Sequence, residues 1–172
     1  MSVRIVIDSL NFVRDAGVRH GKIPLIELKR LHDLLFDQNG ELTFQVTGQL
    51  DENDKPGLYL EIQGNMQLTC QRCLGKLHHC VDVSTFLLLA KSELELNQVD
   101  EDDTPDAILA APDLDIIDLI EDEILLSLPI SVRHAEGECS IPSSRENIIN
   151  NKTNTLHPFA TLALLKKNEP KE

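Results

Sequence analysis

Residues 42–69 read LTFQVTGQLDENDKPGLYLEIQGNMQLT, and this stretch decides the fold. Apolar residues alternate with polar ones on both sides of a central turn. They are Leu42, Phe44 and Val46 before it, and Leu58, Leu60, Ile62, Met66 and Leu68 after it. A period of two residues is typical of a strand with one buried face, and residues 51–57 are rich in the turn formers Asp, Asn, Pro and Gly. We predict an antiparallel hairpin with strands at 42–50 and 58–69.

The sequence on both sides of this hairpin predicts an α+β fold. Alternation continues over residues 81–90 and is found over residues 3–7, which predicts two more strands. Leucines three and four residues apart predict a helix over 24–38, beginning at a proline. A second helix is predicted over 114–128, and its apolar stripe consists of Ile117, Ile120, Ile124 and Leu128. We expect an antiparallel sheet, or a partly open barrel, covered by these two helices.

Length and composition predict one domain over residues 1–172, because a chain of this size can bury a single sufficient core. Residues 91–112 lose all periodicity and are expected to form a mobile acidic loop. Residues 140–156 are polar and rich in Asn, as in a linker, and a short C-terminal helix is expected from Pro158. No apolar run approaches the roughly 20 residues of a membrane span, so we expect a cytoplasmic protein without a membrane partner.

The charge of the chain is concentrated in one segment. The formal net charge is −13, and residues 92–132 hold 13 acidic and no basic residues. A protein that holds nucleic acid by bulk electrostatics needs clustered Lys and Arg. A basic protein is therefore the favoured partner, although acidic stretches also serve as solvated surface. The candidate contacts are Asp118, Glu121, Asp122 and Glu123, which we expect on an exposed helix face.

Four cysteines carry the strongest local signal. Cys70 and Cys73 form a C-x-x-C pair at a strand end, and two such thiolates can converge on one zinc ion. His134 and Cys139 can supply the other two ligands, with Cys80 as a rival. Free thiols remain an alternative. Redox chemistry is weaker, because thioredoxin-type motifs open a helix whereas this pair precedes a turn. The expected cofactor is zinc or none.

Other chemistry has less support in the residues. No phosphate-binding loop, serine elbow or H-E-x-x-H motif is present, so we expect neither catalytic residues nor a small-molecule substrate. RNA contact could involve Arg72 and Lys76 beside the cysteines, and Lys166 with Lys167 near the end. Aromatic residues make up only 3% of the chain, which limits base stacking.

Three ordered segments together carry a resemblance to a known family. They are CQRCL at 70–74, DIIDLIEDEILLSLP at 115–129 and HPFATL at 157–162. In this combination the chain resembles the bacterial YceD family, the large ribosomal RNA subunit accumulation proteins. The chain differs from the family pattern in having His134 at a position of cysteine and His157 at a position of asparagine.

The resemblance implies a non-enzymatic factor that promotes 23S ribosomal RNA accumulation or processing and large-subunit biogenesis. Its partners would be ribosomal precursor components, either a basic protein or 23S ribosomal RNA. Some members place cysteines shortly after the L-P of the second segment, which supports pairing His134 and Cys139 with Cys70 and Cys73. The alternatives are a small thiol-redox or nuclease enzyme, and a protein-binding module unrelated to ribosomes.

Overall fold

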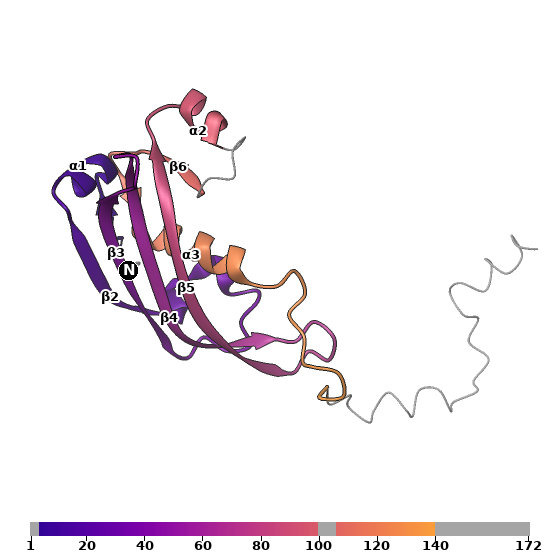
Figure 1. Ribbon diagram of the computed structural model, residues 1–172. Coiled ribbons are helices and arrows are strands. Elements are labelled where there is room, and N and C mark those ends of the chain that lie inside the picture. Colours follow the sequence, from indigo (N-terminus) through magenta and orange to yellow (C-terminus); the bar gives the residue numbers. More distant parts are fainter. Residues whose placement is uncertain (1–3, 100–105, 140–172) are drawn as a thin grey trace, which may run out of the picture. The chain divides into compact units, whose positions relative to one another are not determined.

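The computed structural model describes residues 4–99 and 106–139 (Figure 1). Its main sheet has the strand order β2-β3-β4-β5-β6. The strands are β2 (Val18–Pro24), β3 (Glu41–Leu50), β4 (Pro56–Thr69), β5 (Lys76–Ala90) and β6 (Ala107–Leu109). The strands β2 to β5 form an antiparallel meander, whereas β6 pairs with β5 in parallel. The α+β prediction is confirmed, and within the described residues the sheet does not close into a barrel.

The predicted hairpin is confirmed as β3 and β4, with Phe44 opposite Ile62 and Val46 opposite Leu60. These side chains are buried on one face, while Gln45 is exposed on the other, as the period of two requires. The third predicted strand is also present. It begins at Lys76 instead of residue 81, so β4 and β5 form a long ribbon that extends beyond the rest of the sheet (Figure 1).

The helix α3 (Ile116–Ser127) covers the buried face of the sheet and confirms the prediction for residues 114–128. It begins where the Asp115 carboxylate accepts a hydrogen bond from the Ile117 N–H at 3.0 Å. Ile120 and Ile124 are fully buried, Ile117 is buried and Leu128 packs partly against the core. The predicted apolar stripe is therefore the inner face of the helix.

The helix predicted over residues 24–38 is wrong. Pro24 ends β2, and two 3₁₀ turns follow, η1 (Leu25–Glu27) and η2 (Lys29–Leu31). Leu25, Leu28 and Leu31 are fully buried at a spacing of three. A 3₁₀ helix has three residues per turn, so this spacing presents all three leucines to the core without an α-helix.

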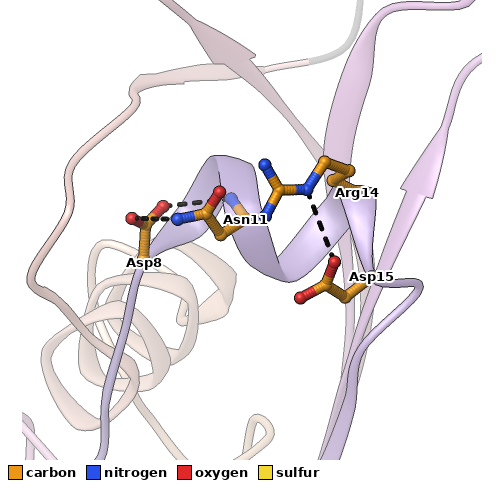
Figure 2. Close-up of polar contacts among 4 residues, drawn as sticks. All are labelled: Asp8, Asn11, Arg14 and Asp15. Atoms are coloured by element: carbon orange, nitrogen blue, oxygen red, sulfur yellow. Dashed lines mark hydrogen bonds and ion pairs between the residues drawn. The ribbon is translucent and has the colours of Figure 1, made fainter.

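A short helix that we did not predict, α1 (Ser9–Arg14), packs against β3 and β4. Asp8 caps it, because its two carboxylate oxygens accept the Asn11 backbone N–H at 3.0 Å and the Asn11 side-chain amide at 2.7 Å (Figure 2). Arg14 and Asp15 form an exposed ion pair at its end. The buried Ser9 hydroxyl donates to the Ala111 carbonyl at 2.9 Å and thereby joins α1 to the chain before α3.

Two further predictions need correction. Within the part of the chain that the structure describes, the first predicted strand is shortened to β1 (Val6–Ile7), which pairs with β7 (Leu114–Asp115) outside the main sheet. The acidic segment is not a loop throughout, since it contains α2 (Glu93–Val99) and β6. The predicted linker at 140–156 and the C-terminal helix with Lys166 and Lys167 lie outside the described residues. None of the described helices is long and apolar enough to cross a membrane.

Candidate metal centre

The turn between β4 and β5, residues 70–75, holds the C-x-x-C pair. The Cys70 N–H donates to the Gly75 carbonyl at 2.9 Å, and the Leu74 N–H donates to the Cys70 carbonyl at 2.8 Å. Leu74 takes a left-handed conformation with φ of 60°. A Cβ atom on Gly75 would lie 3.3 Å from the Cys73 sulfur, so the glycine allows this thiol to approach the backbone closely. We call residues 70–75 the hairpin tip.

The chain after α3, residues 132–139, lies along the hairpin tip, and we call it the second arm. The Gln71 N–H donates to the Val132 carbonyl at 2.9 Å. His134 Nε2 lies 3.0 Å from the Lys76 carbonyl, which can only accept, so Nε2 carries the proton. The lone pair of Nδ1 then faces the cysteines, as it must in a metal-ligating histidine.

Cys70, Cys73, His134 and Cys139 converge on one point. Their ligand atoms all lie within 4.8 Å of one another. The Cys70 and Cys139 sulfurs are 3.8 Å apart, and His134 Nδ1 lies 3.4 Å from the Cys73 sulfur and 3.7 Å from the Cys139 sulfur. A tetrahedral zinc site with these donors has ligand atoms about 3.5 to 3.8 Å apart. The four residues therefore fit a metal ion, whereas Cys80 lies outside the cluster, exposed on β5.

The surroundings of the cluster set its proton affinities. Burial disfavours the Cys70 thiolate, but backbone hydrogen bonds from Cys73, His134 and Arg72 outweigh it and lower the pKa of Cys70 to about 5. Cys73 receives a backbone hydrogen bond from Gly75, yet burial and the neighbouring sulfurs of Cys70 and Cys139 raise its pKa. Hydrogen bonds to Cys139 and Cys70 raise the pKa of His134.

Two of the candidate RNA-contact residues, Arg72 and Lys76, lie within the described residues, and both have partners within the protein. Arg72 Nε donates to the Cys139 sulfur at 3.0 Å, and its Nη2 donates to the Ala135 carbonyl at 3.2 Å. Lys76 pairs with Asp37 at 3.0 Å, and this hydrogen bond lowers the pKa of Asp37. Asp37 lies 39 residues before Lys76, and no sequence pattern indicated either contact.

The acidic contact candidates divide into buried and exposed residues. Glu121 and Glu123 are only 3% and 8% exposed, so the expected exposed helix face is wrong for these two. The Glu121 carboxylate accepts the Arg30 backbone N–H at 3.0 Å. Burial raises the pKa of Glu123, and Asp106 and Asp122 add to the effect. Asp118 and Asp122 are exposed, and Asp122 pairs with the Arg30 guanidinium.

Asp118 and Asp122 lie in a hollow of about 340 Å³, which we call the acidic groove. Sequence reasoning missed it because its wall combines residues from the start of the chain, from β6 and from α3. Its lining consists of Arg4, Ile108, Leu109, Ala111, Asp113, Leu114, Asp115, Asp118, Leu119 and Asp122. Arg4 pairs with Asp115 at 3.1 Å. Asp113 and Asp118 are exposed to solvent.

Comparison with known protein families gives a match. The family model described as "Large ribosomal RNA subunit accumulation protein YceD" matches residues 58–166. No curated protein and no solved structure matches the chain. The matched range contains the hairpin tip, α3 and the second arm, and it supports a role in ribosome biogenesis. Because it covers more than half of the sequence, the chain belongs to the YceD family.

Proposed function

We propose that this protein is a non-enzymatic factor in large-subunit biogenesis, which promotes 23S ribosomal RNA accumulation by binding a basic ribosomal or processing protein. The family supports the connection with large ribosomal RNA. The absence of catalysis and the nature of the partner are inferences from the two sites described above. The metal centre supports the first of them and the acidic groove supports the second.

The observation that carries the proposal is the complete ligand set of the metal centre. Three sulfurs and one imidazole nitrogen converge from the hairpin tip and the second arm. Four protein ligands are typical of structural zinc, because a catalytic zinc keeps one position for water or substrate. Thiolate and imidazole donors also favour zinc over magnesium or calcium. Zinc bound here would join the second arm to the β4–β5 ribbon and would therefore have a structural role.

The acidic groove supports a basic protein partner. Arg4 and Arg30 already pair with Asp115 and Asp122, whereas Asp113 and Asp118 add exposed negative charge. The groove also contains apolar surface, including Leu109, which is 45% exposed. Lys and Arg side chains combine an aliphatic stem with a charged head, so they complement both features. Charge complementarity of this kind mainly accelerates association and selects partners.

The proposal is tested with an Asp113→Asn, Asp118→Asn double variant. The matched control is Glu52→Gln, Asp82→Asn, which removes the same charge at exposed positions in the β3–β4 turn and on β5. Tagged proteins are purified from cells at low and high salt, and the captured proteins and the cellular 23S ribosomal RNA are quantified. We expect the groove variant to lose basic ribosomal proteins and to lower 23S ribosomal RNA, with the larger difference in capture at low salt. Unchanged capture and unchanged RNA in the groove variant would contradict the proposal.

Ultraviolet crosslinking in the same cells separates protein-mediated action from direct RNA contact. If 23S fragments are crosslinked and no basic proteins are captured, the partner is RNA and not a basic protein. Incubation of the purified protein with precursor 23S ribosomal RNA and divalent cations tests the enzymatic alternative. Cleavage that a Cys70→Ser, Cys73→Ser variant retains would indicate a nuclease independent of the metal centre, and the proposal of a non-enzymatic factor would be wrong.

A further inference from the structure

Arg72 connects the two halves of the metal centre. It lies between the two cysteines of the hairpin tip, and its guanidinium reaches two points of the second arm. Nε donates to the sulfur of Cys139 at 3.0 Å, and Nη2 donates to the carbonyl of Ala135 at 3.2 Å. One side chain thus contacts both a ligand atom and the backbone that carries this ligand.

The other ligands already have partners that orient them. Backbone N–H groups of the hairpin tip face the sulfurs of Cys70 and Cys73, and the Lys76 carbonyl orients His134. Besides its contacts with the ligands Cys70 and His134, the Cys139 sulfur accepts a hydrogen bond from Arg72 Nε. Groups that hydrogen-bond to metal ligands fix their orientation, and their removal typically weakens metal affinity about 10- to 100-fold.

The charge of the centre also favours a nearby cation. Three thiolates and one divalent ion leave a net negative charge, and a guanidinium that donates to one of the sulfurs compensates it directly. A lysine ammonium could replace the charge but could not bridge a sulfur and a carbonyl with a planar fork. The geometry therefore favours arginine specifically.

We propose that Arg72 is a positioning residue of the metal centre, which retains Cys139 as the fourth ligand and closes the second arm on the hairpin tip. This role differs from the RNA contact that the sequence indicated for Arg72. It is independent of the partner proposed above, since it concerns only contacts within the chain.

The test compares Arg72→Ala and Arg72→Lys with Arg133→Ala in the full-length protein. Arg133 is an exposed arginine next to the ligand His134, so its removal changes the local charge equally. Zinc affinity and release are measured by competition with a chromogenic chelator. Cobalt substitution reports the number of thiolate ligands through the thiolate-to-cobalt absorption.

We expect Arg72→Ala to weaken zinc binding about 10- to 100-fold and to reduce the cobalt absorption to that of two thiolates. Arg72→Lys should fall between Arg72→Ala and the unaltered protein, and Arg133→Ala should match the unaltered protein. Equal losses in Arg72→Ala and Arg133→Ala would show an effect of net charge alone and would overturn the proposal. Unchanged zinc affinity and cobalt absorption in Arg72→Ala would also overturn it, and loss of RNA crosslinking in that variant would then restore the RNA role.

Discussion

The core beneath the sheet and the metal centre are stabilised in different ways. The core consists of apolar side chains from distant segments, and Leu42, Leu60 and Ile120 are completely buried in it. In the hairpin tip, Cys70 is fully buried but Leu74 is 69% exposed. Backbone hydrogen bonds and four converging ligand atoms give this region its geometry. The core should therefore respond to changes in side-chain volume, and the metal centre to changes in metal, protons and backbone conformation.

The largest expected effect is in the core. Ile120→Ala removes a fully buried side chain and leaves a cavity between α3 and the sheet, so the free energy of unfolding should fall by about 2–5 kcal/mol. Leu126→Ala on the same helix is the control, because this residue is 76% exposed. Denaturant titration of both variants measures the difference. Equal effects in the two variants would mean that the stripe of α3 does not stabilise the core.

Metal removal should affect the metal centre and leave the core unchanged. At free zinc 100 times the dissociation constant, binding stabilises the folded protein by about 2.7 kcal/mol. Chelation should remove this contribution and lower the hydrogen-exchange protection of the hairpin tip and the second arm, while α3 keeps its protection. Hydrogen exchange measured by mass spectrometry checks this. A Cys70→Ser, Cys73→Ser variant should lose the same hydrogen-exchange protection without chelator, which would confirm that loss of the metal causes the effect. Unfolding of α3 on chelation would contradict the distinction between the two regions.

The metal centre should also be the region that responds to pH. Zinc requires thiolates and a neutral imidazole, so zinc binding displaces protons from the ligands. For each proton displaced, the zinc affinity falls about tenfold when the pH is lowered by one unit. The raised pKa values of Cys73 and His134 mean that both bind protons first as the pH falls. Cys70, with a pKa of about 5, adds to the slope only below that pH. Zinc titrations between pH 5 and 8 should show weaker binding at lower pH, and a flat profile would refute the ligand set.

The smallest effect is expected at Leu74, whose left-handed conformation strains a residue with a Cβ atom. Leu74→Gly relieves roughly 1 kcal/mol of strain, but glycine adds a comparable entropy to the unfolded chain. The net change in the free energy of unfolding should stay under about 1 kcal/mol. Leu74→Ala is the control, because it truncates the exposed side chain and keeps the strain. Thermal unfolding should show Leu74→Gly at least as stable as Leu74→Ala, and the opposite order would mean that the leucyl side chain determines the turn.

The elements that could be predicted from the sequence are those with a strong local pattern. Alternation around residues 51–57 predicts the hairpin, and the stripe through Ile120 predicts α3. The strand β2 has no such pattern, because at the sheet edge only Ile23 is buried and Arg19 and Lys22 face solvent. Charged residues are common on edge strands, where they discourage pairing with other chains.

The metal centre was partly predictable for a related reason. The spacing of Cys70 and Cys73 indicates a shared ion, and His134 with Cys139 completes the set that the structure brings together. The contacts of Arg72 and the burial of Glu121 could not be predicted, since both depend on segments far away in the sequence. The same is true of the acidic groove, which combines residues near the start of the chain with β6 and α3.

The parallel pairing of β6 with the last residues of β5 has a consequence for how the protein can bind its partners. It places β6 and α2 at one end of the β4–β5 ribbon and the hairpin tip at the other (Figure 1). The 15 residues of β5 separate these ends by up to about 45 Å. This distance exceeds the Debye length of about 8 Å several times. An extended peptide would need roughly 13 residues to reach from one end to the other, so a shorter peptide at one end could not contact the other.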